Sequence, residues 1–223
     1  MEFFEYPDRD MAAMRIADML AGKLRELLMN RESVSLAVPG GTTPGPIFDV
    51  LSAADVDWDR VTIMLTDERW VEPDSPRSNA GLISARLLQG PAAAARFQPF
   101  YKHGMTADEA AKELSEEISG LLPLSMVLLG MGDDMHTASL FPGARGLDTA
   151  LAEDAPALCA IETDAQPEPR ITLSAPALNR AIEKHLVIFG DSKREAFEAA
   201  MSQPAHVAPI RAVIQGGFVH WAA

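Results

Sequence analysis

Cysteine is nearly absent from the 223-residue sequence, which contains only Cys159. A single cysteine excludes a disulfide framework and a thiolate metal site within one chain. The segment ALCAI around it is apolar, which favours a buried structural thiol over a nucleophile. Metal-ligand spacing such as H-E-x-x-H is missing as well, so we expect no bound metal.

Long hydrophobic runs are also absent. No stretch of the sequence approaches the roughly 18 apolar residues that a membrane-spanning helix requires. The first residues, MEFFEYPDRD, are acidic and lack the basic and then apolar order of a secretory signal. We therefore expect a soluble protein of the cytoplasm.

Positive charge is scarce, because 19 lysines and arginines stand against 32 aspartates and glutamates, and the net charge is −13. This balance argues against binding to nucleic acid or to an anionic membrane. A small anionic ligand needs only a local group of cations and backbone N–H groups. Arginines and lysines beside glycine-rich turns are therefore the residues to examine.

The residues that are abundant are typical of a globular α/β domain. Hydrophobic residues make up 48 % and charged residues 23 % of the chain, which are ordinary values. A chain of this length buries about 70 % or more of its unfolded surface. No internal repeat, low-complexity tract or linker interrupts residues 1–223, so we expect them to form a single domain.

Apolar segments with helical and strand-like patterns alternate along the chain. Helical spacing predicts a helix over 8–30, and short apolar runs predict strands at 33–38, 61–66 and 126–130. Further strands are expected at 96–101, 156–162, 170–174, 185–190 and 218–222, and further helices at 44–54, 81–88, 106–119, 175–182, 191–201 and 210–215. This alternation predicts an α/β fold with a mostly parallel sheet and helices on both faces.

Three helix starts carry capping signals. Thr106 and Glu109 have the spacing of a capping box. Thr43, which precedes Pro44, and Asp191 are each expected to cap the helix that follows.

Glycine and threonine residues follow the strand predicted at 33–38. In an open parallel sheet, ligands bind beyond the carboxyl ends of the strands, which is where Gly40-Gly41-Thr42-Thr43 would lie. Free backbone N–H groups and a helix start favour an anion there, although a tight turn before a capped helix would use the same residues. No Gly-Lys-Ser/Thr follows, so the turn is not a Walker A loop.

Charged residues follow two other predicted strands. Asp67-Glu68-Arg69 comes directly after 61–66, as either a solvated turn or a site arginine held by neighbouring carboxylates. A guanidinium can grip a phosphate or a carboxylate with two bonds. Gly190-Asp191-Ser192-Lys193-Arg194 ends the strand at 185–190 and places Lys193 at the same edge of the sheet.

The segment LLGMGDDMHTASLFPG, residues 128–143, opens like a dinucleotide-binding loop. That fingerprint needs a third glycine or alanine where Met135 stands, so a nicotinamide or flavin site is not expected. Asp134 lies two residues before His136, and an aspartate beside a histidine can orient the ring and support it as a general base. The histidines without such a setting are expected to be structural or at the surface: His103, His185, His206 and His220. No G-x-S-x-G motif occurs, which argues against a serine hydrolase.

Five motifs stand in a fixed order along the chain: GGTTP (40–44), DERWV with SN after it (67–71 and 78–79), GMGDDMHTASLFPG (130–143), RITLSAPALN (170–179) and GDSKRE (190–195). In this order the chain resembles the 6-phosphogluconolactonase family, from about residue 30 to its end. It is similar, more weakly, to the glucosamine-6-phosphate deaminase and isomerase branch, which shares the fold and the glycine-rich first loop.

The resemblance implies a Rossmann-like sheet without a metal or nucleotide cofactor. It implies hydrolysis of 6-phospho-D-glucono-1,5-lactone to 6-phosphogluconate, the second step of the oxidative pentose phosphate pathway. The partner would be this small phosphorylated sugar lactone, and the protein would act as a monomer.

The resemblance also assigns roles to residues of this sequence. His136 would take a proton from the attacking water, Asp134 would hold its imidazole, and Arg69 would assist. The positions implied to bind the substrate and its phosphate are Gly40, Gly41, Thr42, Gly132, Arg170 and Lys193. The family usually has glycine in place of Met135, and glycine tolerates backbone conformations that methionine resists.

Two other functions compete with lactone hydrolysis. A glucosamine-6-phosphate deaminase or aldose–ketose isomerase needs a carboxylate base, and the deaminase branch usually has Gly-His-Ile-Ala-Phe-Asn-Glu where this chain has His-Thr-Ala-Ser-Leu-Phe-Pro. A non-catalytic sugar-phosphate sensor usually carries a DNA-binding module, but no basic helix–turn–helix segment occurs here. The sequence therefore favours the lactonase.

Overall fold

A seven-stranded parallel sheet forms the centre of the protein in the computed structural model, which describes residues 1–164 and 166–223. The strands lie in the order β1 (Glu2–Tyr6), β10 (Phe218–Ala222), β9 (Glu183–Phe189), β6 (Met126–Leu129), β2 (Val34–Val38), β3 (Val61–Leu65) and β5 (Arg96–Gln98). Each strand runs parallel to its neighbours in this sheet. This arrangement confirms the predicted fold class.

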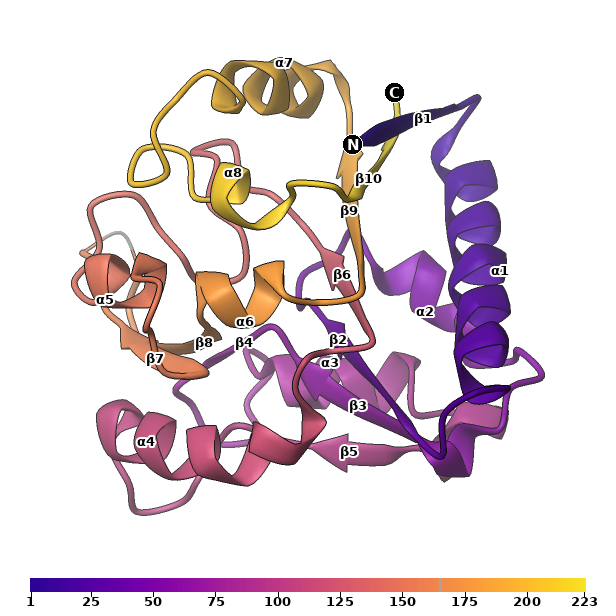
Figure 1. Ribbon diagram of the computed structural model, residues 1–223, viewed down its shortest axis with the longest axis horizontal. Helices are drawn as coiled ribbons and strands as arrows, with labels where there is room; N and C mark the ends of the chain where they lie inside the picture. The colour runs from indigo at the N-terminus through magenta and orange to yellow at the C-terminus, as the bar shows by residue number, and fades with distance from the viewer. Residues whose placement is uncertain (165) are drawn as a thin grey trace.

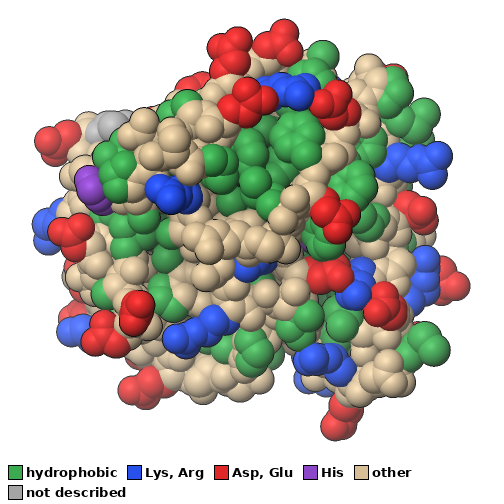
Figure 2. Space-filling view, turned by 45° about the horizontal axis from the view of Figure 1, so that its top comes forward, with side chains coloured by type: hydrophobic (Ala, Val, Ile, Leu, Met, Phe, Trp, Pro, Cys, Tyr) green, Lys and Arg blue, Asp and Glu red, His purple; other side chains and the backbone are tan. Residues whose placement is uncertain are grey.

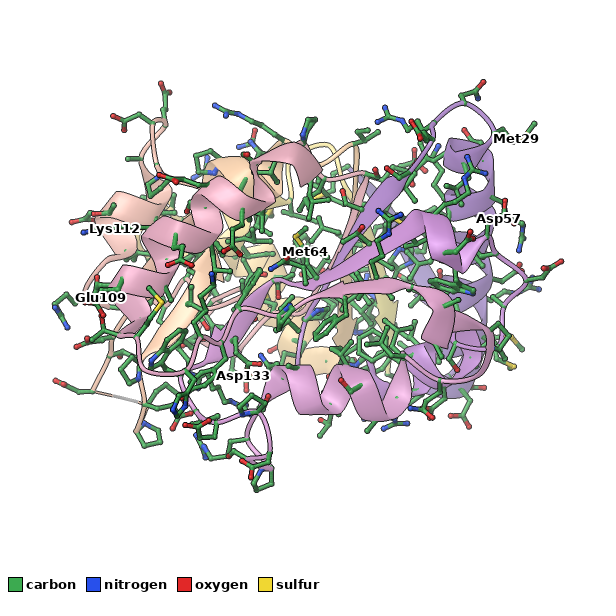
Figure 3. The ribbon with its side chains drawn as sticks, turned by 90° about the horizontal axis from the view of Figure 1, so that it is seen from below. Met29, Asp57, Met64, Glu109, Lys112 and Asp133 are labelled. Carbon is green, nitrogen blue, oxygen red and sulfur yellow. The ribbon has the colours of Figure 1, made fainter. Side chains whose placement is uncertain are left out.

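Helices cover both faces of the sheet. Figure 1 shows α1 (Arg9–Leu28) and α2 (Gly45–Leu51) on one side of the strands, and α5 (Leu147–Leu151), α6 (Ala175–Asn179) and α8 (Ile210–Val213) on the other. The remaining helices are α3 (Asn79–Arg86), α4 (Ala107–Glu117) and α7 (Asp191–Ala200), with short 3₁₀ turns at Trp58–Arg60, Gly90–Ala94 and Ile118–Leu121. Because both faces are covered, every residue of β2, β3 and β6 is buried, which explains their continuous apolar sequences. Met64 of β3 lies at the centre of the molecule (Figure 3).

A second, three-stranded sheet lies beside the first one. It contains β4 (Asp67–Arg69), β8 (Arg170–Leu173) and β7 (Leu158–Ile161), and both of its pairings are antiparallel. The sequence predicted strands near β7 and β8 but no separate sheet, and it did not predict a strand at 67–69. Strands β7 and β8 cannot pair in parallel, because only residues 162–169 connect them and a parallel crossover connection needs about a dozen residues or more.

The first strand of the parallel sheet was missed by the sequence analysis. Residues Glu2–Tyr6 form β1, which pairs with β10 at one edge and places the two chain ends side by side (Figure 1). Four of the five residues are exposed, so β1 lacks the apolar run that marked the inner strands.

The capping predictions had different outcomes. The capping box is confirmed, since the Thr106 hydroxyl accepts a bond from the Glu109 N–H and the Glu109 carboxylate accepts one from the Thr106 N–H. The Thr43 cap is wrong, because α2 begins at Gly45 after Pro44 and has no side-chain cap. The Asp191 cap is also wrong, because Gly190, at φ +86°, turns the chain so that Asp191 is already the first helical residue.

The single cysteine and four of the histidines have the structural or surface settings that the sequence predicted. Cys159 is 5 % exposed and burial raises the pKa of its thiol to about 11, as expected for an inert thiol. His185 and His220 are buried and bonded to each other, whereas His103 and His206 are exposed, which confirms their assignment.

None of the helices in the described part of the chain has the length and apolar character needed to span a membrane.

Candidate active site

A cavity of about 330 Å³ opens at the carboxyl ends of β2, β6 and β9. This volume lies within the range of small-molecule sites. Seven of the predicted site residues line it: Gly40, Gly41, Arg69, Gly132, His136, Arg170 and Lys193. Asp134 contacts the cavity only through His136, and Thr42 is exposed outside the lining, where Thr43 and Pro44 stand instead.

His136 and Asp134 form a close pair on the loop after β6. The imidazole Nδ1 lies 2.5 Å from the Asp134 Oδ1, which also accepts the backbone N–H of His136 at 3.2 Å. Burial tends to raise the pKa of Asp134, but the hydrogen bonds and charge of His136 outweigh it and hold that pKa below its usual value. The imidazole packs on the ring of Phe141, with 4.4 Å between the centroids. The pair therefore has a fixed ring orientation and an ionised carboxylate behind it.

A tight turn gives the His136 loop its shape. The Gly132 N–H donates to the His136 carbonyl at 2.9 Å, and the Met135 N–H donates to the Gly132 carbonyl at 3.0 Å. Met135 has φ +65°, in the left-handed region that glycine favours. The loop thus follows the path expected for a glycine at this position, and His136 still meets Asp134.

Gly132 is needed for a reason other than the one expected. A Cβ atom added at Gly132 would lie 2.2 Å from the imidazole Nδ1 and Cε1 and 2.5 Å from the Asp134 Oδ1. The absent side chain makes room for the His136–Asp134 pair itself. Gly40 plays a similar part, since a Cβ there would lie 2.0 Å from the Asn79 amide oxygen.

Two arginines face the cavity from the antiparallel sheet. Arg69 of β4 and Arg170 of β8 are direct register partners. Arg69 donates to the Arg77 carbonyl at 2.7 Å and Arg170 donates to the Gln166 amide oxygen at 2.6 Å. The Nε of each arginine is buried without a hydrogen-bond partner among the described residues. Buried donors of this kind are normally bonded, so these two indicate an anionic ligand.

Lys193 completes the group of cations. It comes from the first turn of α7, and its Nζ lies 3.1 Å from a carboxylate oxygen of Asp133, which belongs to the same loop as His136. Asp133 is labelled in Figure 3. The site therefore draws its cations from three elements that are far apart in the sequence.

The structure adds residues that the sequence analysis did not select. Asp67 and Asn79 line the cavity and are 6 % and 4 % exposed. Asp67 accepts bonds from the hydroxyls of Ser139 at 2.5 Å and Thr66 at 2.9 Å. The motif DER contains Asp67, but only its arginine was assigned, and nothing in the sequence marks Asn79 as near Gly40.

Glu68 connects β4 to α3 beneath the site. Its fully buried carboxylate accepts the N–H groups of Arg69, Asn79 and Ala80, at 2.8, 2.7 and 2.8 Å. Burial raises the pKa of Glu68, while these backbone bonds oppose the rise. The start of α3 is thereby held against the arginine strand, which places Asn79 and Arg69 at one wall of the cavity.

A parallel α/β sheet with a histidine–aspartate pair and three cations at its carboxyl edge defines a protein that binds and acts on a small anionic molecule. The family described as glucosamine-6-phosphate isomerases/6-phosphogluconolactonase matches residues 7–221, and the chain belongs to it. This confirms the resemblance found in the sequence.

Known relatives agree with this assignment. The chain is 42 % identical over 212 residues to a 6-phosphogluconolactonase of Mesorhizobium japonicum, covering 94 % of this chain and 88 % of the relative. It is 39 % identical over 218 residues to a 6-phosphogluconolactonase of Rhizobium meliloti, with 96 % and 93 % coverage. Its fold matches the crystal structure of a 6-phosphogluconolactonase from Shewanella baltica with a TM-score of 0.95, at 34 % identity and with 100 % and 98 % of the two chains covered.

Proposed function

We propose that this chain hydrolyses 6-phospho-D-glucono-1,5-lactone to 6-phosphogluconate, in the oxidative pentose phosphate pathway. The relatives named 6-phosphogluconolactonase over nearly the whole chain support this activity. The observation that carries the chemistry is the His136–Asp134 pair, which shares one cavity with Arg69, Arg170 and Lys193.

His136 acts as the general base in this proposal. Asp134 occupies Nδ1, so neutral Nε2 takes a proton from a water molecule while the water oxygen bonds to the lactone carbonyl carbon. The carbonyl π electrons move to its oxygen and give a tetrahedral oxyanion. As this intermediate collapses, the bond from the carbonyl carbon to the ring oxygen breaks, and the imidazolium gives its proton to that oxygen. Asp134 stabilises the imidazolium between the two steps.

The cations and backbone donors bind the two negatively charged groups of the tetrahedral intermediate, which are the oxyanion and the phosphate. Arg69, with N–H groups of the glycine loops, stabilises the oxyanion as it forms. Arg170, Lys193 and the turn at Gly40 and Gly41 bind the phosphate. In that turn Thr43, which lines the cavity, takes the part that the sequence assigned to Thr42.

The protein acts as one unit, residues 1–223, and as a monomer in this proposal. Every group assigned above lies on a single chain, so the site needs no second copy. We place the protein in the cytoplasm, because a phosphorylated sugar does not cross a membrane unaided. Light scattering at the assay concentration tests the monomer, and a dimer mass would contradict it.

One observation favours a second function, glucosamine-6-phosphate deamination. That reaction needs a carboxylate base facing the sugar, and Asp67 is a carboxylate in the wall of this cavity. Asp67 is held by Ser139 and Thr66, however, and after His136 the chain has Thr-Ala-Ser-Leu-Phe-Pro in place of the Ile-Ala-Phe-Asn-Glu of the deaminase branch. The lactonase remains the better supported function.

Parallel assays separate the two functions. The lactone is generated in the cuvette by oxidation of glucose 6-phosphate, and its loss is followed with and without the protein, since it also hydrolyses spontaneously. Ammonia release from glucosamine 6-phosphate is measured alongside. We expect rapid lactone loss and no ammonia. Ammonia release with lactone loss at the spontaneous rate would replace our proposal with the deaminase.

A further inference from the structure

Glu168 lies among three arginines, two of which, Arg69 and Arg170, line the cavity. Its carboxylate is 11 % exposed, and its Oε1 is 2.7 Å from the Arg77 Nη2, with the Arg77 Nε at 3.3 Å. The same oxygen lies 3.8 Å from the Arg170 Nη2 and 4.0 Å from the Arg69 Nε. A single carboxylate thus serves three guanidinium groups.

The Glu168 carboxylate offsets a charge repulsion that the antiparallel sheet creates between two arginines. Arg69 and Arg170 are directly opposite each other on β4 and β8, and like charges in that position repel and destabilise the pair. Arg170 is 5 % exposed, so water screens this repulsion poorly. Glu168, two residues before Arg170, places a negative charge beside both guanidinium groups.

The balance is incomplete without a further anion. Two carboxylates, Glu168 and Asp67, face three positive charges, and the Nε atoms of both cavity arginines are buried without hydrogen-bond partners among the described residues. Gln166 gives Arg170 a neutral acceptor from the same segment and also lines the cavity. A ligand anion that reaches the arginines therefore shares them with Glu168.

We propose that Glu168 is a built-in counter-ion that holds the arginine pair in place when the cavity is empty and weakens its hold on the anion of the ligand. The proposal rests on the proposed function, because it takes that ligand to be phosphorylated. Glu168 is a positioning residue: it acts through Arg69 and Arg170, and touches no reacting atom. It keeps the arginines ordered between turnovers and limits how tightly the phosphorylated product is retained.

The test measures inorganic phosphate binding by the whole protein, by calorimetry, in wild type and Glu168→Gln. Glutamine has the same shape and keeps one acceptor for Arg77, but it removes the charge. We expect the dissociation constant for phosphate to fall by about three- to tenfold, because one like charge near the ligand is gone. The melting temperature without phosphate should fall, and phosphate should raise it by more than in wild type.

Steady-state kinetics distinguish an effect on phosphate binding from a general effect on the structure, because the KM values of a phosphorylated and an unphosphorylated lactone can be compared. The KM for the phosphorylated lactone should fall in Glu168→Gln, while its KM for unphosphorylated gluconolactone stays within about twofold of wild type. Glu162→Gln is the matched control, because Glu162 pairs with Arg145, which does not line the cavity, and forms no ion pair with Arg69 or Arg170 among the described residues. It should leave phosphate affinity unchanged.

The outcomes separate this inference from the proposed function. Phosphate affinity that is equal or weaker in Glu168→Gln overturns the counter-ion role, even if lactone hydrolysis is intact. A wild-type protein that neither binds phosphate nor hydrolyses the lactone overturns both proposals. If Glu168→Gln does not fold, Glu168→Asp draws the charge back by one methylene, and phosphate binding no tighter than in wild type overturns the inference.

Discussion

Met135 is one of two non-glycine residues with a positive φ in the described chain, and the other is Ala138 at φ +50°. A non-glycine residue at φ +65° is disfavoured, yet the surrounding bonds hold it there, including one from the Ile210 N–H to the Met135 carbonyl at 3.2 Å. The sequence predicted that methionine resists the backbone conformation that the family's usual glycine tolerates here. The structure keeps the loop path instead, because α8 and the Gly132 turn fix both ends of the residue.

Strain at Met135 predicts an order of stability among substitutions. Glycine and alanine both lose the packing of the methionine side chain, but only glycine relieves the left-handed conformation. Met135→Gly should therefore be about 1 kcal/mol more stable than Met135→Ala. Urea unfolding of the two variants measures this difference. Equal stability, or a more stable alanine variant, would show that the folded protein does not hold residue 135 in the left-handed region.

Only some of the residues of the candidate site could be predicted from the sequence. The Asp134–His136 pair could be predicted because two-residue spacing after a strand brings the groups together. Thr42 and Thr43 could not be told apart, since that choice depends on where α2 begins, and it begins at Gly45. Asn79 belongs to the SN motif quoted from the sequence, but its place in the cavity could not be predicted, because its closeness to Gly40 depends on how Glu68 docks α3.

At the scale of elements, β1 is held to the sheet by a chain of buried hydrogen bonds. The Tyr6 hydroxyl lies 2.9 Å from the His220 Nδ1, and the His220 Nε2 lies 3.1 Å from the His185 Nδ1. The His185 Nε2 lies 3.3 Å from a carboxylate oxygen of Glu183. Burial, with a smaller contribution from His185, lowers the pKa of His220 to about 3.

This low pKa makes stability fall as the pH is lowered. The unfolded chain takes up a proton on His220 near its ordinary pKa of 6.5, but the folded chain does not until about pH 3. Stability contributed by neutral His220 is complete above pH 6.5 and declines between 6.5 and 3. Between pH 7 and pH 5 the free energy of unfolding should drop by about 2 kcal/mol from this residue.

Urea unfolding at pH 7 and pH 5 in wild type and His220→Gln isolates the effect, since glutamine keeps hydrogen bonding but does not titrate. This range lies above the titration of most carboxylates. The variant should lose about 2 kcal/mol less than wild type over the same interval. An identical loss in both proteins would mean that His220 is protonated in the folded state at pH 5.

The elements themselves were predicted best where burial is complete. Strands β2, β3 and β6 are buried along their whole length, so their apolar runs marked them. The edge strand β1 has no such apolar run because most of its residues are exposed. Strand β4 has none because all three of its residues are charged. The separate antiparallel sheet was hidden because strand direction depends on connection length and not on the strand's own residues.

At the scale of the whole molecule, an acidic protein encloses a cationic site. The net charge is −13, and Figure 2 shows acidic (red) and basic (blue) side chains interspersed on one face, with hydrophobic side chains (green) grouped in its upper part. Arg69, Arg170 and Lys193 meet because the end of β4 and the starts of β8 and α7 lie at the same cavity. The sequence could predict that cations lie near strand ends, but not that two would be register partners.

This assembly predicts a phosphate-specific effect for Lys193→Ala. The KM for the phosphorylated lactone should rise at least about tenfold, because a charge-assisted bond to the ligand is lost, while the KM for unphosphorylated gluconolactone stays unchanged. Lys112→Ala is the control, since Lys112 projects from α4 at the surface (Figure 3) and should have no effect. A similar rise for both lactones would exclude Lys193 from phosphate binding.

The most direct test of the account is the rate of lactone hydrolysis by His136→Asn, measured above the spontaneous background. Asparagine keeps a polar group beside Asp134 but cannot take the proton from water. We predict that kcat falls at least about a hundredfold, with circular dichroism and melting temperature unchanged. A loss of less than about threefold in a folded variant would contradict the central claim that His136 is the base.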